Sequence, residues 1–291
     1  MKSSPVENKQ ISARKKKDKV YKGLFFAATM FGVVVLAILI VDVLQKGTGA
    51  LNWNFLNSFP SRSPEKAGLK SALFGTLWVI GLTAPMAFII GVGTALYLEE
   101  YAKKNWVTRV IQTNISNLAG VPSIVYGLLG LTIFVRMFAL ERSVIAGALT
   151  MTLLILPVII VASQEALRSV SDSLRHASFA LGATKWQTIL RIILPSALPG
   201  IITGNILALS RAIGETAPLV VVGAAAFIAF TPNNPLDPFT VLPIQIYNWV
   251  SRPQEAFHAL AAGGIIVLLA VLLSMNAVAV LIRNKFQKKM D

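Results

Sequence analysis

The chain has 291 residues, of which 55% are hydrophobic and only 14% are charged. Soluble domains carry roughly 25% charged residues, so this composition, with a mean hydropathy of +0.66, excludes an ordinary soluble protein and predicts an all-α polytopic integral membrane protein. The net charge of +14 would otherwise suggest nucleic-acid binding, but eight of the 27 Lys and Arg lie in the first 22 residues. With no cysteine and two histidines, neither a disulfide framework nor a metal site is expected.

Six apolar stretches are long enough to cross a membrane, since a bilayer core about 30 Å thick needs about 20 apolar residues per helix. They predict six transmembrane helices, over 23–44, 71–98, 110–135, 144–162, 197–230 and 259–282. The third stretch is polar in its first half, and charged residues interrupt the fifth. The first stretch is too long for a signal peptide and lacks a small-residue cleavage pattern after it, so we expect it to remain as an anchor.

The distribution of Lys and Arg predicts which loops face the cytoplasm. With the N-terminus inside, 19 Lys and Arg fall within 76 inside residues, and 7 fall within 62 outside residues. Leaving out the fifth span would move the basic segment 283–285 outside, so we expect six spans with both termini in the cytoplasm. The basic run 14–17 is interpreted as a topology signal beside anionic lipid, with a nucleic-acid-binding arm as the alternative.

Polar side chains gather in the third stretch around Pro122. They are Asn114, Ser116, Asn117, Ser123 and Tyr126. Two interpretations stay open: these side chains line a polar route across the membrane, or they hold neighbouring helices together.

The loop 163–196, between the fourth and fifth stretches, is the most specific feature of the sequence. Apolar residues recur at helical spacing on both sides of Gly182, which predicts two amphipathic helices joined by a sharp turn. Such a bracket fits a groove on a partner protein, with Leu181 and Trp186 as anchors. The alternative is an amphipathic helix that lies on the bilayer surface and needs no partner.

This loop resembles the cytoplasmic loop of the permease subunits of ABC importers. Their pattern is Glu-Ala-Ala, three residues, Gly, nine residues, Ile, one residue and Leu-Pro, and the spacing fits throughout. The matching positions are Ala177, Gly182, Ile192, Leu194 and Pro195, whereas His176 stands where Glu is usual and Ser178 where Ala is usual.

The resemblance implies that the loop docks into a cleft on an ATPase subunit and transmits the closure of that subunit to the membrane helices. The residues implied in this coupling are His176, Ala177, Leu181, Gly182, Trp186, Ile192, Leu194 and Pro195. The sequence contains no GxxxxGKS/T phosphate cradle. We therefore expect a transport subunit and not an enzyme, with no cofactor in this chain and with ATP and Mg on partner ATPase subunits.

The fifth stretch contains two opposite charges, Arg211 and Glu215, followed by Pro218. An Arg at the centre of a membrane helix opposes insertion by about 2.5 to 3.5 kcal/mol. Four residues apart on one helix, the two charges are expected to share a face, in a stripe with Gly204 and Ala208 that faces a partner helix or a wet cavity. Either the pair is static, or Arg211 offers its planar donors to an oxyanion while Glu215 holds or releases it.

Three segments narrow the resemblance to phosphate importer permeases of the PstA type. They are 210–218 in the fifth stretch, 117–127 in the third, and the outer loop 242–253. The outer loop also carries Ile244, Tyr247 and Trp249, which suit a short segment anchored at the membrane interface. The candidate substrate pathway consists of Arg211, Glu215, Thr216, Asn117 and Ser123.

The resemblance implies a type I ABC importer permease architecture and an assembly with several partners. The expected parts are a basic cytoplasmic tail at 1–22, a first transmembrane helix with an outer segment at 23–70, a permease domain at 71–283 that includes the coupling loop, and a cytoplasmic tail at 284–291. The implied partners are a homologous second permease (PstC type), two ATPase subunits (PstB type), an extracytoplasmic phosphate-binding protein (PstS type) and membrane lipid, with no nucleic acid. The expected activity is import of inorganic phosphate across the bacterial cytoplasmic (inner) membrane by alternating access.

Three other activities compete with this one. A permease for sulfate or molybdate fits everything except the fifth-stretch and outer-loop segments. An ion-coupled secondary carrier would use Glu215 as its proton site and would need no ATPase. An intramembrane enzyme has little support, because the sequence lacks HExxH and has no His near a suitable Ser.

Overall fold

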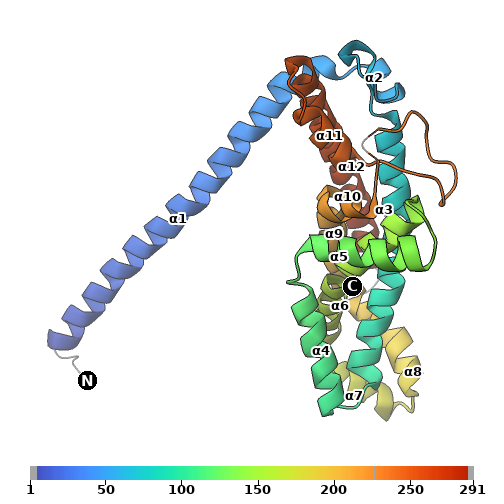
Figure 1. Cartoon of the computed structure of the whole chain (residues 1–291). Coiled ribbons are helices and arrows are strands. Elements are labelled where there is room, and N and C mark those ends of the chain that lie inside the picture. Colours follow the sequence, from blue (N-terminus) through green and yellow to red (C-terminus); the bar gives the residue numbers. More distant parts are fainter. Residues whose placement is uncertain (1–4, 226, 288–291) are drawn as a thin grey trace.

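The computed structural model describes residues 5–225 and 227–287. These residues are mostly helical and form no β-strand, which confirms the all-α fold class (Figure 1). An isolated β-bridge joins Ser143 to Pro238.

The chain alternates long helices with short helical segments. In chain order the elements are α1 (Pro5–Gly47), η1 (Thr48–Ala50), α2 (Trp53–Asn57), η2 (Pro64–Lys66), α3 (Lys70–Leu96), η3 (Tyr97–Tyr101), α4 (Trp106–Leu118), α5 (Ser123–Gly130), η4 (Leu131–Met137), α6 (Val144–Arg168), α7 (Asp172–Ala180), α8 (Lys185–Thr188), η5 (Ile189–Ile193), α9 (Leu194–Gly214), α10 (Ala217–Val222), α11 (Leu242–Val250) and α12 (Glu255–Gln287). The segments η1 and η2 are 3-10 helices, whereas η3, η4 and η5 are π-helical.

Within the described residues, five helices are long and apolar enough to cross a membrane. They cover Lys17–Ala50, Lys70–Tyr101, Val144–Arg168, Lys185–Gly214 and Glu255–Lys285. A bent pair, Trp106–Leu118 with Ser123–Met137, meets the same requirement when its halves are taken together, which gives up to six spans. The chain is therefore polytopic, as predicted.

The third predicted span differs from the structure, because it is not one straight helix. The chain bends by 105° between α4 and α5. Pro122 precedes α5 with an extended ψ of 134°, and a proline has no amide hydrogen to continue the helical ladder. The Tyr126 hydroxyl donates to the Leu118 carbonyl across the bend, at 2.8 Å, so this polar side chain joins the two halves.

The fifth predicted span was placed too far along the chain. The helical run begins at Lys185 and ends at Gly214, so the prediction of a span reaching residue 230 is wrong. Glu215 is extended, with ψ 127°, and the short helix α10 follows. Pro218 permits this break, because it cannot donate a hydrogen bond to the Gly214 carbonyl four residues earlier.

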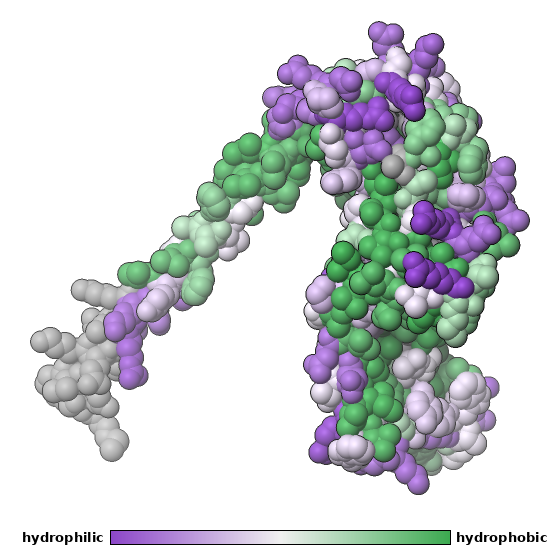
Figure 2. Space-filling view, in the orientation of Figure 1, coloured by the Kyte–Doolittle hydropathy of each residue, from purple (hydrophilic) through white to green (hydrophobic). Residues whose placement is uncertain are grey.

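The first helix stands apart from the rest of the chain (Figure 1). Its apolar side chains form an exposed surface along most of its length, green in Figure 2. At its C-terminal end it approaches α12 closely: a Cβ added at Gly47 would lie 2.7 Å from the Ala262 carbonyl carbon. In this chain alone, the apolar surface of α1 has no protein cover, so it requires lipid or another subunit.

The two ends of the helical body carry different connections (Figure 1). One end carries α7 and α8, and the other carries α2 and α11. At the second end, Trp249 of α11 is fully buried and packs against Phe55 of α2, with ring centroids 5.8 Å apart. Ile244 is also buried, whereas Tyr247 is exposed. The predicted interfacial role is therefore wrong for both buried residues: α2 and α12 cover Trp249, and Ile244 packs in the main core with Val79 and Phe239.

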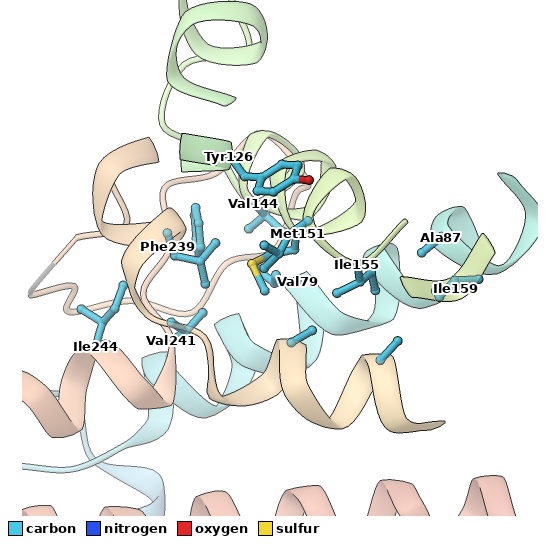
Figure 3. Packing of buried hydrophobic residues seen from close by; sticks show 14 residues of the cluster. Val79, Ala87, Tyr126, Val144, Met151, Ile155, Ile159, Phe239, Val241 and Ile244 are labelled. Atoms are coloured by element: carbon cyan, nitrogen blue, oxygen red, sulfur yellow. The ribbon is translucent and has the colours of Figure 1, made fainter. Parts of the chain in front are cut away.

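The main core lies where α3, α6, α9 and the segment after α10 meet. Val79 of α3, Met151 and Ile155 of α6 and Phe239 point toward one another there (Figure 3). The Phe239 ring lies directly on α6, because Gly147 has no side chain: an added Cβ would be 2.4 Å from the ring carbon Cζ. This contact holds the irregular segment 227–241 against the helices.

We predict that Gly147→Ala lowers the stability of the protein by about 1 to 3 kcal/mol, since the new methyl group overlaps the buried Phe239 ring. Gly81→Ala in α3 is the matched control, because an added Cβ meets no atom within 4 Å there. The measurement is the melting temperature of the purified protein in detergent. Equal melting temperatures for the two variants would contradict the proposed packing.

Candidate functional site

Arg211 and Glu215 form an ion pair where α9 ends. Arg211 lies in the last turn of α9, and Glu215 is the residue at which the helix stops. The Arg211 Nε lies 3.4 Å from the Glu215 Oε1. The Arg211 side chain is 54% exposed and that of Glu215 is 19% exposed. The two charges therefore pair as expected, but at a helix end and not within one continuous helix.

Neighbouring residues of α9 determine which way Arg211 faces. Ala208 and Ala212 are buried in the main core against α6. The Ser210 hydroxyl donates to Asn276 Oδ1 of α12 at 2.8 Å. Because adjacent residues on an α-helix point about 100° apart, Arg211 lies on a face that neither α6 nor α12 covers. Sequence reasoning missed Asn276. It is a polar side chain within the apolar run of α12, and its position there could have indicated a contact with another helix.

The predicted stripe of small and charged residues divides between several neighbours. Gly204 packs on α6, where an added Cβ would lie 2.5 Å from Ala162 Cβ. Pro218 is buried against α5, since a Cβ at Gly127 would lie 2.8 Å from the Pro218 Cα. The small residues of the stripe thus face other helices of this chain, which was one expectation. Arg211 is exposed on the outer face of the chain, as the alternative of a wet cavity requires.

The remaining pathway candidates lie near the two breaks in the helices. Thr216 precedes α10 and is half-buried. Ser123 is the first residue of α5 and is half-buried, whereas Asn117 is exposed near the end of α4. Within the described part of the chain, no hydrogen bond or ion pair joins Asn117 or Ser123 to Arg211. The structure brings α5 and α10 into contact. Of the five predicted pathway residues, it places Arg211 and Glu215 in direct contact with each other.

A small cavity lies on the inner side of α9, and neither Arg211 nor Glu215 lines it. It measures about 20 Å³ and lies between α3, α6, α9 and α10. Its lining is mainly apolar: Thr76, Val79, Ile80, Thr83, Met151, Leu209, Ala212, Ile213, Leu219 and Val241. A cavity of this size holds about one water molecule. Arg211, whose side chain is 54% exposed, is instead open to the outer face of this chain.

The loop before α9 folds as the expected helix–turn–helix bracket, here defined as α7 and α8 with the turn between them. Gly182 has a φ of +81°, a left-handed conformation that favours glycine, so it makes the turn. Thr184 and Gln187 form a capping box that starts α8. The hydroxyls of Ser178 and Thr188 are buried and lie 2.8 Å apart. Ser178, which stands where alanine is usual, therefore joins α7 to the last residue of α8, next to η5.

The predicted coupling residues occupy two different places. Leu181 and Trp186 are 89% and 59% exposed, and His176 and Ala177 are also exposed, as is Gly182. By contrast, Ile192, Leu194 and Pro195 are half-buried in η5 and at the start of α9. The first group forms an open apolar surface at the tip of the bracket, and the second connects the bracket to the membrane span.

Comparison with known proteins agrees with this architecture. Residues 87–290 match the family described as binding-protein-dependent transport system inner membrane component. The chain is 35% identical over 289 residues to the phosphate transport system permease protein PstA 1 of Mycobacterium tuberculosis, covering 96% of this chain and 93% of that protein. It is 32% identical to the probable ABC transporter permease protein YqgI of Bacillus subtilis, covering 95% of this chain and 98% of that protein.

Solved structures of ABC transporters share the fold at low sequence identity. A bacterial alginate ABC transporter in complex with an alginate pentasaccharide-bound periplasmic protein gives a TM-score of 0.66 at 16% identity, covering 94% of this chain and 96% of that chain. The inward-facing MetNI methionine ABC transporter gives 0.59 at 18% identity, covering 74% of this chain and 94% of that chain. The helical architecture, the bracket and these matches lead to one conclusion: the chain belongs to the family of binding-protein-dependent transport system inner membrane components, the membrane permeases of ABC importers.

Proposed function

We propose that this chain is a permease subunit that moves inorganic phosphate into the bacterial cell, driven by ATP on partner ATPase subunits. The observation that carries the proposal is Arg211, a half-exposed guanidinium at the end of a membrane-spanning helix. The names of several relatives, which refer to phosphate transport, support the choice of oxyanion. The further partners are a homologous second permease and an external phosphate-binding protein.

The geometry of Arg211 suits brief contact with phosphate. It contacts Glu215 through Nε, and within the described residues its two terminal nitrogens make no hydrogen bond. A guanidinium presents planar donors that match two oxygens of a tetrahedral oxyanion. Because Glu215 competes for the same group, binding is weak, and a transported ion must be released.

Exposure of Arg211 also favours a second subunit. A charged side chain facing hydrocarbon costs several kcal/mol, so this face of α9 belongs beside a wet cavity or another protein surface. The cavity on the inner side of α9 holds about one water and is lined mainly by apolar side chains, so it offers an oxyanion no polar route. We place the pathway between this chain and the homologous permease, with Arg211, Glu215 and Thr216 on this side of it.

The bracket supplies the connection to the ATPase subunits. We place the α7–α8 end in the cytoplasm together with both termini, in line with the excess of Lys and Arg on that side. Exposed Leu181 and Trp186 would then enter a groove of the ATPase subunit. Closure of two ATPase subunits on ATP would displace the bracket and change which side of the membrane reaches Arg211.

Uptake of labelled phosphate in cells that depend on this chain tests the substrate. We expect unlabelled phosphate to compete, and equal concentrations of sulfate or molybdate to leave uptake unchanged. Competition by sulfate or molybdate alone would assign a different oxyanion to the same scaffold. Nucleotide-independent uptake by the isolated chain in liposomes would instead indicate a secondary carrier.

Arg211→Gln should lower phosphate uptake about tenfold or more, because hydrogen bonds to a charged group contribute about 1.5 to 3 kcal/mol. Arg211→Lys should recover part of the uptake, since it keeps the charge but loses the planar donors. Assembly of the complex should be unchanged in both variants, because Arg211 is half-exposed and Ser210 still bonds Asn276. If these variants failed to assemble with the other subunits, Arg211 and Glu215 would instead be a static pair that holds the structure together.

Leu181→Ala should weaken binding of the ATPase subunits, because this side chain is 89% exposed and is free to enter a groove. Leu236→Ala is the control: its side chain is 57% exposed in the segment between α10 and α11, away from the bracket. The measurement is the amount of ATPase that co-purifies with each variant in mild detergent. Equal recovery with both variants would support a bracket that lies on the bilayer.

A further inference from the structure

Three consecutive residues after α3 each contact a cation on a different helix of the α7–α8 end. Glu99 pairs with Arg168 at the end of α6, Glu100 pairs with Arg175 of α7, and Tyr101 lies under Lys185 of α8. These partners are 69, 75 and 84 positions away in the sequence. We propose that Glu99, Glu100 and Tyr101, here called the α3 clasp, form the mechanical link through which displacement of the bracket moves α3.

The Glu100–Arg175 ion pair is the most enclosed part of the α3 clasp. The side chains are 7% and 20% exposed, so water screens their attraction little. A second terminal nitrogen of Arg175 donates to the Leu167 carbonyl at 3.1 Å. Arg175 therefore joins α7 both to η3 and to the last turn of α6. Removing one member of such a pair leaves a buried charge without its partner, which is strongly unfavourable.

The Glu99 contacts extend the connection to α6. Glu99 Oε1 accepts from Arg168 at 2.5 Å and from the Gln164 amide at 3.0 Å. Arg168 is 48% exposed, and both charged residues line an open cavity of about 330 Å³. Because water reaches this pair, it contributes less than the enclosed Glu100–Arg175 pair.

Tyr101 adds a contact with the second half of the bracket. The Lys185 Nζ lies 4.9 Å from the centre of the Tyr101 ring, within range of a cation–π interaction. Lys185 is the first residue of α8, so this contact lies beyond the Gly182 turn. The α3 clasp consequently holds both helices of the bracket and not α7 alone.

The local backbone explains how three adjacent residues reach three helices. Successive side chains of a helix fan out around its axis by about 100° each. The clasp lies in the π-helical segment η3, and the chain leaves the helix at Ala102, whose ψ is 135°. The end of α3 therefore contacts α6, α7 and α8, and these charged contacts add to the apolar packing of Ala95 and Leu98 beside them.

This inference rests on the proposed function, because it assumes that ATPase subunits displace the bracket. It predicts that breaking the clasp separates ATP hydrolysis from transport while the subunits remain assembled. Glu100→Arg and Arg175→Glu should each lower phosphate uptake about tenfold or more in proteoliposomes that contain the full complex, with ATPase activity retained. The double variant, which reverses the pair, should take up more phosphate than either single variant, although position 175 then no longer donates to the Leu167 carbonyl.

Matched control variants distinguish loss of the clasp contacts from a general effect of removing a charge. Asp172→Asn removes another carboxylate near Arg175, at 3.5 Å from its Nε, but Asp172 is 86% exposed and lies on α7 itself. It should leave uptake unchanged, as should Tyr101→Phe, which keeps the aromatic ring under Lys185. If the charge-reversed single variants fail to assemble, Glu100→Gln preserves the side-chain volume and should still reduce uptake.

A second readout needs no transported solute. The chain has no cysteine, so Gly81→Cys in α3, where an added Cβ meets no atom within 4 Å, provides one labelling position for an environment-sensitive fluorophore. ATP should change the fluorescence of the otherwise unaltered complex, and Glu100→Gln should remove most of that change. Swapping the pair should restore part of it.

The outcomes distinguish this inference from the proposed function. If the unaltered complex responds to ATP but takes up no phosphate, the proposed substrate is wrong and the fluorescence comparison still decides the role of the clasp. If Glu100→Gln leaves both the fluorescence response and uptake unchanged, or if the double variant takes up no more phosphate than the single variants, the clasp is not the link. Equal losses with Asp172→Asn would also overturn it.

Discussion

An arginine at the end of a membrane-spanning helix constrains the surroundings of the whole span. A guanidinium facing hydrocarbon costs several kcal/mol, so Arg211 must have a counter-charge, water or another protein surface beside it. Glu215 supplies the first at 3.4 Å, yet more than half of the Arg211 side chain stays exposed. The small residues on the buried face of α9, together with the Ser210–Asn276 bond, hold the charge in this outward position.

The same region contains the two places where membrane helices break. Backbone that is not helical at membrane depth must be covered by protein, because its polar groups cannot bond to lipid. Here the breaks cover each other: Gly127 of α5 has no side chain, and Pro218 of α10 packs directly on it. This contact places irregular backbone next to the ion pair, where movement of either helix changes the surroundings of the charge.

Three surfaces of this chain are incomplete in one copy: the apolar length of α1, the open face of Arg211, and the tip of the bracket. In the proposed function they face lipid or a second permease, a shared pathway, and the ATPase subunits. The α3 clasp connects the last of these with the helical body. Such incomplete surfaces fit the proposed assembly, in which the clasp would transmit displacement of the bracket to α3.

The sequence by itself determined the features that depend on local pattern: the long apolar runs, the glycine turn at Gly182, the pairing of Arg211 with Glu215, and the motif of the coupling loop. It did not determine where helices stop, since Pro157 lies within α6 whereas Pro122 and Pro218 stand at breaks, depending on what packs beside each one. Burial of Trp249 and the contacts of Glu99, Glu100 and Tyr101 also came only from the tertiary structure. Their partners lie far away in the chain, and only the packing of the spans brings those groups within reach.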